Sequence, residues 1–231
     1  MVIHGLQKMT LLDFPGKVAC TLFTGGCNLR CPFCHNAFLV TEIDNSQVYS
    51  EDEIIKFLNT RIGLLDGVCI TGGEPLLQND ISDFIKKIKE LGFPVKLDTN
   101  GCYPDKLAYL IDNNLIDYAA MDIKNSKNKY SLTVGIENLD LSAIEKSINL
   151  LKDNKIDYEF RTTVIKEFHE VEDFDQIGEW IKGAPRYFLQ GFTDSGNLIG
   201  ENMHPVDKET MLKMRDLASK YVNICEIRGV D

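Results

Sequence analysis

Apolar residues along this chain recur with two alternating periods, and each period predicts a different kind of element. Short β-branched runs such as 18–23 and 67–71 predict buried strands, whereas segments such as 50–62 repeat apolar positions at helical spacing. Ser50 and Glu53 stand at the start of that segment in the pattern of a capping box. The expected strands are 18–23, 67–71, 94–99, 116–124, 157–165, 186–192 and 222–227, and the expected helices are 50–62, 79–92, 104–114, 141–154, 171–183 and 207–221.

Strands that alternate with helices in this way predict a parallel sheet with right-handed crossover connections. No low-complexity run and no change in composition divides the chain, so we expect residues 1–231 to form a single domain. Six or seven βα units are fewer than the eight that close a TIM barrel. The pattern by itself therefore favours an α/β fold that is either an open doubly wound sheet or an incomplete barrel.

The charge of the chain limits the partners that it can have. It carries 25 Lys and Arg against 35 Asp and Glu, and the resulting net charge of −10 argues against binding to a nucleic-acid backbone. No apolar run approaches the roughly 20 residues of a membrane span. The opening MVIHGLQKMTLLDFPGK also lacks the basic start and apolar core of a signal peptide. We therefore expect a cytoplasmic protein with neither a nucleic-acid nor a membrane partner.

Polar clusters occur at the ends of most of the predicted strands. They comprise TGGCNLRCPFCHN at 24–36, TGGEP at 71–75, DTNG at 98–101, MDIKN at 121–125, Arg161 and Gln190. In parallel α/β folds, the binding and catalytic groups lie at the carboxyl ends of the strands, in the loops that follow them. The clusters are therefore expected to form one site at this edge of the sheet.

Three cysteines, Cys27, Cys31 and Cys34, fall within eight residues in the first of these clusters. A structural zinc site normally has four Cys or His ligands, and an electron-transfer [4Fe–4S] cluster has four cysteines, but no fourth ligand is evident. His35 directly follows Cys34, and two adjacent residues rarely bind one ion well. The spacing thus favours a [4Fe–4S] cluster held by three cysteines, with one iron open to an exchangeable ligand. The other cysteines are scattered over separate elements: Cys20, Cys69, Cys102 and Cys225.

The motif C-x₃-C-x₂-C, present as CNLRCPFC, resembles the signature of the radical SAM enzymes, which use S-adenosylmethionine (SAM). CHN after this motif, DTNG, MDIK and an arginine on the fifth strand are similar to the activases of glycyl radical enzymes. The opening segment up to residue 36 is most like the anaerobic ribonucleoside-triphosphate reductase activating proteins. This resemblance covers nearly the full chain. It implies a partial (β/α)₆ TIM-type barrel with parallel strands and outer helices.

The resemblance also implies a role for each site residue. By this resemblance the cluster is held by Cys27, Cys31 and Cys34, and the methionine amino group of SAM contacts the stretch Gly72, Gly73 and Glu74. The carboxylate and ribose of SAM are expected near Asn36, Asp98, Asp122, Lys124 and Arg161. A monovalent cation is expected on Asp98, Thr99 and Asp122.

The implied function is that of a radical SAM oxidoreductase that cleaves SAM reductively and forms a glycyl radical on a partner, foremost an anaerobic ribonucleoside-triphosphate reductase. A flavodoxin- or ferredoxin-type protein is the expected reductant. Many activases carry an eight-cysteine ferredoxin-like module, which this sequence lacks, so we expect a single cluster. Only four residues follow the last predicted strand, so we expect a loop of the partner to cover the site.

Three other functions are compatible with the same residues. One is activation of a pyruvate formate-lyase-type enzyme, and the second is a radical SAM reaction on a small molecule. The third is a non-catalytic binding protein that an iron–sulfur cluster or zinc stabilises. A fourth cysteine ligand would favour the third function, and a closed small-molecule pocket would favour the second.

Overall fold

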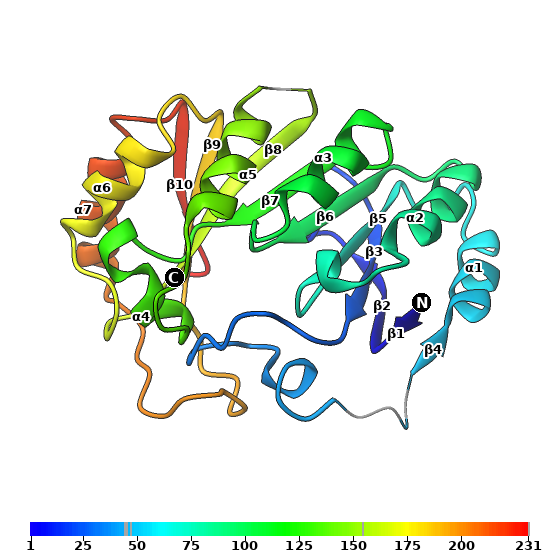
Figure 1. Cartoon of the computed structure of the whole chain (residues 1–231), viewed down its shortest axis with the longest axis horizontal. Coiled ribbons are helices and arrows are strands. Elements are labelled where there is room, and N and C mark those ends of the chain that lie inside the picture. Colours follow the sequence, from blue (N-terminus) through cyan, green and yellow to red (C-terminus); the bar gives the residue numbers. More distant parts are fainter. Residues whose placement is uncertain (44–45, 47, 154, 231) are drawn as a thin grey trace.

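The computed structural model describes residues 1–43, 46, 48–153 and 155–230 (Figure 1). Within these residues the main sheet has eight strands in the order β10-β9-β8-β7-β6-β5-β3-β2. Their bounds are β2 Gly5–Thr10, β3 Ala19–Thr24, β5 Gly67–Gly72, β6 Val95–Thr99, β7 Tyr118–Asp122, β8 Asp157–Val164, β9 Arg186–Gly191 and β10 Ile224–Arg228. β2 runs antiparallel to β3, and all other neighbouring strands are parallel.

The order of the strands decides between the two folds that the pattern allowed. It follows the chain from β2 to β10 without a reversal, as in a barrel, whereas a doubly wound sheet reverses its order at a switch point. β2 and β10 each pair on one side only, so the barrel does not close. The predicted α/β fold, a partial TIM-type barrel, is therefore confirmed.

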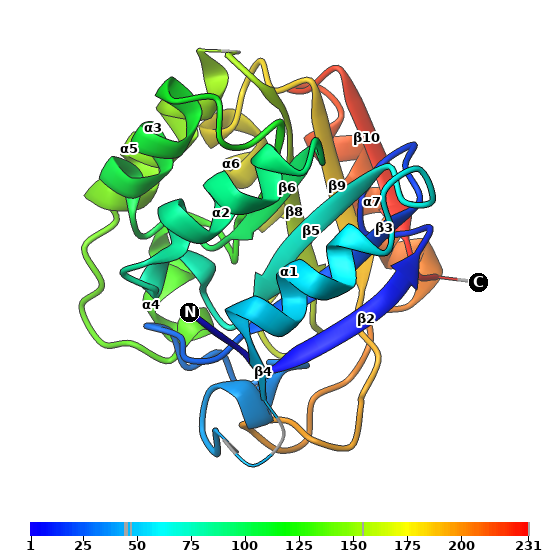
Figure 2. The ribbon, with the colours of Figure 1, turned by 90° about the vertical axis from the view of Figure 1, so that its right-hand side faces the viewer.

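The predicted helices are all present, and they lie along the outer side of the curved sheet (Figures 1 and 2). Ser50 caps the first helix as predicted: its hydroxyl accepts from the Glu53 N–H at 3.3 Å, and the Glu53 carboxylate accepts from the Ser50 N–H at 2.8 Å. None of the helices in the described part of the chain is long and apolar enough to span a bilayer. The helix bounds are α1 Glu51–Asn59, α2 Ile81–Glu90, α3 Pro104–Asp112, α4 Tyr130–Val134, α5 Ser142–Lys152, α6 Asp173–Trp180 and α7 Lys208–Ala218.

Several short elements were not expected from the sequence. The antiparallel edge strand β2 escapes the apolar pattern because most of its side chains are partly or fully exposed, and the one buried residue is Thr10. β1 Val2–Ile3 pairs with β4 Tyr49–Ser50, and both strands are too short to show a period. The described residues also form 3₁₀ turns at Ala37–Leu39, Pro75–Leu77 and Lys127–Lys129, and the short helix α4 was likewise not predicted.

The inner face of the partial barrel carries charged residues, which the alternation along β8 illustrates. Tyr158, Phe160 and Thr162 are buried on one face, and Glu159 and Arg161 alternate with them on the other. Burying charged groups is unfavourable unless they are paired. The inner face is therefore built from ion pairs, and these pairs form the floor and wall of the site described next.

Candidate active site

A cavity of about 240 Å³ lies at the carboxyl ends of the strands. Cysteines from the loop after β3, glycines from the end of β5 and charged groups from β6, β7 and β8 meet there, as the parallel topology requires. Gln190 at the end of β9 also lines the cavity. The predicted residues that line it are Cys27, Cys31, Cys34, Asn36, Gly72, Gly73, Asp98, Thr99, Asp122, Lys124 and Arg161.

The three cysteines lie on the loop that connects β3 to the 3₁₀ turn at 37–39. The Leu29 N–H donates to the Cys27 Sγ at 3.4 Å, and the Cys34 N–H donates to the Cys31 carbonyl at 3.1 Å. Burial raises the pKa of all three thiols, that of Cys31 to about 12, although the nearby Lys124 ammonium opposes the shift. Without iron the side chains are therefore thiols, and iron binding has to release their protons.

The donor set of this loop fits a cluster better than a single ion. Within the described residues, no three His, Cys, Asp or Glu side chains converge on one metal position. A [4Fe–4S] cube does not need such convergence, because each thiolate binds a separate iron of the cube. Thiolates are also the soft ligands that iron–sulfur clusters use. His35 points its ring toward Phe192, with 5.4 Å between the ring centroids.

Two glycines hold the loop after β5 against the cysteine loop. The Gly73 N–H donates to the Thr24 carbonyl at 2.9 Å, and a Cβ at Gly73 would lie 2.0 Å from the Gly26 carbonyl oxygen. Only glycine fits at position 73 for this reason. The Asn36 Nδ2 donates to the Gly72 carbonyl at 3.0 Å and joins the two loops a second time. The cysteine loop and the glycine loop thus form one rigid wall of the cavity.

Glu74 lies behind this wall, where it is fully buried and does not line the cavity. Its Oε1 accepts from the Leu76 N–H at 3.0 Å and from the Thr99 hydroxyl at 2.9 Å, and its Oε2 accepts from the Asn100 N–H at 2.7 Å. Burial raises the pKa of Glu74 to about 7, against the effect of these donors. Direct contact of Glu74 with SAM stays a prediction; in this structure its carboxylate fixes the loop that follows β6.

We expect Glu74→Gln to destabilise the protein by about 1–3 kcal/mol, because one N–H donor loses its carboxylate acceptor in a buried place. The NH₂ group that replaces one carboxylate oxygen would face either the Asn100 N–H or the Leu76 N–H and the Thr99 hydroxyl. Urea unfolding of the iron-free protein measures this change. A control is Glu170→Gln, since the Glu170 side chain is 73% exposed and makes a surface ion pair. Equal stability of both variants would show that Glu74 does not hold the loop.

Asn100 belongs to the predicted polar cluster DTNG, and its side chain links the loop after β6 to the cysteine loop. Its Nδ2 donates to the Asn28 Oδ1 at 2.9 Å and lies 3.8 Å from the Cys27 Sγ, and its Oδ1 accepts from the Cys102 N–H at 3.0 Å. An asparagine between a site aspartate and a glycine is also an ordinary turn signal. The sequence therefore gave no separate indication of this contact with the cluster loop.

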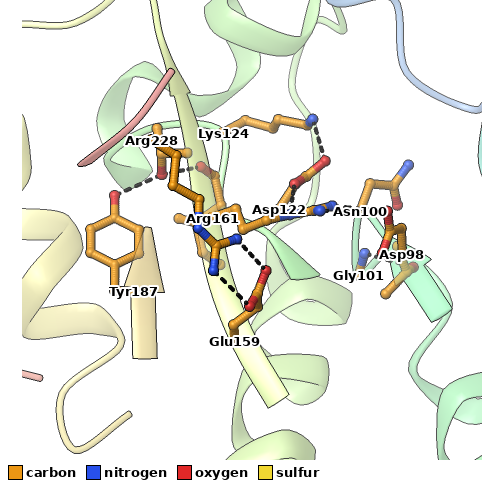
Figure 3. Close-up of polar contacts among 12 residues, drawn as sticks. Asp98, Asn100, Gly101, Asp122, Lys124, Glu159, Arg161, Tyr187 and Arg228 are labelled. Carbon is orange, nitrogen blue, oxygen red and sulfur yellow. Dashed lines mark hydrogen bonds and ion pairs between the residues drawn. The ribbon is translucent and has the colours of Figure 1, made fainter. Parts of the chain in front are cut away.

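Arg161 and Lys124 neutralise the two carboxylates of the cavity (Figure 3). Arg161 Nε donates to the Asp122 Oδ1 at 3.2 Å, and its guanidinium lies 3.4 Å from the Asp98 Oδ2. Lys124 Nζ donates to the Asp122 Oδ2 at 2.9 Å. Burial alone would raise the pKa of Asp122, but the charges of Lys124 and Arg161 lower it to about 2. Burial would likewise raise the pKa of Asp98, but the charges of Arg161 and Lys96 lower it, so both carboxylates remain ionised at neutral pH.

Lys96 completes this row of charges, and the sequence analysis did not identify it. Its side chain is 2% exposed, and its ammonium contacts the Asp98 Oδ1 and lies 3.8 Å from the Cys69 Sγ. The Thr99 hydroxyl meanwhile donates to Glu74 rather than turning toward Asp98. The Thr99 hydroxyl is therefore not directed to the carboxylates of Asp98 and Asp122, and a cation held by these three residues stays a prediction.

A second charged group lies farther along the inner face and was also not predicted. Glu159 is 1% exposed and accepts from the Tyr118 hydroxyl at 2.8 Å. It also accepts from the Arg228 guanidinium at 3.2 Å (Figure 3). The Arg228 guanidinium lies 3.2 Å from the centroid of the Phe188 ring. These contacts join β7, β8, β9 and β10 and so hold the last strand in place. The residues that make them do not line the cavity.

Comparisons with known proteins agree with the chemistry of the cavity. The model of the Radical SAM superfamily matches residues 21–181. A Methanocaldococcus jannaschii protein with the provisional name of glycyl-radical enzyme activating enzyme is 33% identical over 237 residues, which cover 100% of this chain and 97% of that protein. The pyruvate formate-lyase-activating enzyme of Clostridium pasteurianum is 27% identical over 204 residues, with 80% of this chain and 84% of that enzyme covered.

A solved structure supports the fold. The crystal structure of Streptococcus suis SuiB bound to S-adenosylmethionine matches with a TM-score of 0.68 at 15% identity. The match covers 90% of this chain and 52% of that chain, so the shared part is the partial barrel. Because the family model spans more than half of the sequence, the chain belongs to the radical SAM superfamily, whose members use a [4Fe–4S] cluster and SAM.

Proposed function

We propose that this protein is an activase that forms a glycyl radical on an anaerobic ribonucleoside-triphosphate reductase. The observation that carries the proposal is the cavity itself, in which three cysteines, a glycine loop and paired charges meet at one end of the barrel. Similarity over the whole chain to an activating enzyme supports the activase class. The reductase as partner rests on the opening segment, and a flavodoxin- or ferredoxin-type protein is the proposed reductant.

A pyruvate formate-lyase-type partner is the second candidate. It is favoured by the similarity to the Clostridium pasteurianum enzyme, which covers 80% of this chain. The site residues do not separate the two partners, because both would use the same cavity. The difference has to lie in the surface that meets the partner, and the experiment below therefore includes both.

The residues of the cavity fit the two cofactors that the family uses. Cys27, Cys31 and Cys34 would hold three irons, and SAM would bind beside the fourth. When bound, the cluster and SAM supply a one-electron cleavage that gives methionine and a 5′-deoxyadenosyl radical. The protein has to orient SAM and exclude water from this reaction.

The charged residues suit the ends of SAM. Arg161 and Lys124 are cations that would attract the carboxylate of the methionine part. Asp98 and Asp122 are ionised acceptors that would bind ribose hydroxyls. Carbonyl groups of the glycine loop would accept from the methionine ammonium, because Gly72 and Gly73 allow a close approach of the backbone.

A backbone glycine of a partner protein suits the remaining step. The glycine Cα would give a hydrogen atom to the 5′ carbon, which yields 5′-deoxyadenosine and leaves the unpaired electron on the glycine. Glycine has no side chain to clash with the cavity wall, and the flanking amides stabilise the radical. A loop of the partner laid over the cavity would also shield the reaction from water.

The test is anaerobic mixing of the iron-loaded protein with SAM, a reductant and either partner, followed by EPR. We expect a glycyl doublet with the reductase and none when the partner's radical glycine is replaced by alanine. A doublet only with a pyruvate formate-lyase-type partner would support the activase class and reject the reductase. If neither partner gives a doublet while a small molecule is turned over with SAM, the activase proposal is wrong.

A further inference from the structure

Lys96 is a buried lysine at the back of the candidate site. It lies on β6 two residues before Asp98, so both side chains point to the inner face of the barrel. The side chain is 2% exposed, and it does not line the cavity. A charge buried to this degree is retained only where a partner compensates it. Here the partner is Asp98, one of the residues that would surround SAM.

Every carboxylate oxygen of Asp98 and Asp122 is in contact with a cationic side chain. Lys96 contacts the Oδ1 of Asp98, and Arg161 lies 3.4 Å from its Oδ2. Arg161 contacts the Oδ1 of Asp122 at 3.2 Å, and Lys124 its Oδ2 at 2.9 Å. A metal cation bound between the two aspartates would have to share these oxygens with the ammonium and guanidinium groups and lie close to their positive charges.

The Thr99 hydroxyl, the neutral oxygen expected to bind the cation, is also engaged elsewhere. The Thr99 hydroxyl donates to the Glu74 carboxylate at 2.9 Å and accepts from the Gly101 N–H at 3.2 Å. The other neighbour of the Lys96 ammonium is the sulfur of Cys69, which is a poor ligand for a hard alkali-metal cation. Neither the Thr99 hydroxyl nor the Cys69 sulfur therefore offers a free hard ligand beside Asp98.

The charge balance leads to the same conclusion. Two carboxylates, Asp98 and Asp122, face three cations, Lys96, Lys124 and Arg161. The group already carries an excess of one positive charge, which suits the anionic carboxylate of SAM. A further cation would add to this excess of positive charge in a poorly screened place.

We infer that the Lys96 ammonium supplies the neutralisation of Asp98 that an alkali-metal cation would otherwise provide, so that this protein holds SAM without such a cation. The inference rests on the proposed function only in that the cavity is taken to bind SAM. Lys96 acts on SAM through Asp98, which it neutralises and holds in position. It is therefore a positioning residue rather than a catalytic one.

The first test uses the unaltered, iron-loaded protein. SAM affinity is measured by calorimetry in potassium chloride and in tetramethylammonium chloride of equal ionic strength. We expect the same dissociation constant in both salts, because the built-in ammonium replaces the metal ion. An affinity that is about tenfold higher in potassium, or 1.4 kcal/mol, would overturn the inference.

The second test uses two substitutions at the same position. Lys96→Ala leaves space near Asp98, and we expect SAM affinity to fall on the order of tenfold in tetramethylammonium and to recover in potassium. Lys96→Met fills the space with an apolar side chain, so its loss should not recover. Lys129→Ala is the matched control: it also removes an ammonium from a buried carboxylate, Asp173, but away from the cavity. Its SAM affinity should not depend on potassium, whereas potassium dependence in this control or its absence in Lys96→Ala contradicts the inference.

A third readout does not depend on SAM. Thallium(I) NMR detects alkali-type sites directly, and it can be applied to the protein before iron and SAM are added. We expect a saturable thallium signal for Lys96→Ala and none for the unaltered protein. A saturable signal in the unaltered protein that Asp98→Asn removes would overturn the inference even if SAM does not bind. Failure of SAM binding alone, with the expected thallium result, would instead count against the proposed function.

Discussion

Replacement of Cys27, Cys31 or Cys34 by alanine is expected to abolish the cluster. Anaerobic reconstitution of the unaltered protein should give about four irons per chain, the content of one [4Fe–4S] cluster. Each of these thiols lines the cavity, and two thiolates cannot hold a cube that needs three protein ligands. Iron content should therefore fall to near zero in each variant, and SAM cleavage should fall with it. Iron analysis and the absorbance of the cluster measure the loss.

The other four cysteines provide matched controls in the same chain. Cys20 and Cys69 are fully buried in the sheet, and neither Cys102 nor Cys225 lines the cavity. Alanine at any of these positions should leave the iron content unchanged. Cys102 is the most demanding control, because its N–H binds the Asn100 side chain that also approaches Cys27. Loss of iron in Cys102→Ala would mean that a fourth cysteine takes part and that no iron is left open.

Much of the site was predictable because parallel strands bring their carboxyl ends together. The cysteine loop after β3 and Arg161 on β8 are far apart in sequence, yet both line one cavity. Their meeting follows from the alternation of strands and helices and from the position of each polar cluster at a strand end. The pattern does not predict which of these side chains contact one another in the cavity, because that depends on the direction in which each side chain points.

Lys96 shows what the alternation indicates and what it leaves open. A lysine two residues before Asp98 on a buried strand shares a face with it, so a signal was present in PVKLDT. That signal does not distinguish a lysine that reaches the solvent from one that bends toward Asp98. The structure shows that the second case holds, because the Lys96 side chain is 2% exposed and its ammonium contacts Asp98. The contacts of Glu74 were hidden in the same way, since they depend on how the loop after β6 folds back.

The pair of Glu159 and Arg228 was hidden for another reason. These residues are 69 positions apart, and they lie on strands that have β9 between them. No local period connects them, and an arginine near the end of a chain is usually a surface residue. The edge strand β2 was missed because exposed strands do not show the apolar alternation by which strands are recognised.

Arg161→Ala is expected to cost about 3–5 kcal/mol of stability, because it leaves two buried carboxylates without the cation between them. The Arg161 side chain is 14% exposed, and it contacts both Asp98 and Asp122. Lys96 and Lys124 each remain on one carboxylate only, so they offset part of the lost attraction. Urea unfolding of the iron-free protein at neutral pH measures the change without any contribution from bound SAM.

Arg215→Ala is the control, because Arg215 is 36% exposed and pairs with the exposed Asp216 next to it, so its loss should cost less than about 1 kcal/mol. The pH dependence gives a second criterion. The pKa of Asp122 is lowered in the folded protein from 3.8 to about 2, so its contribution is complete above the unfolded value and is lost as the pH falls between the two. Removal of Arg161 raises the pKa of Asp122 in the folded protein. The difference between the folded and unfolded pKa values then becomes smaller, and stability depends less on pH in the acid range. A variant as stable as the unaltered protein, with the same acid dependence, would show that water and not Arg161 compensates the two carboxylates.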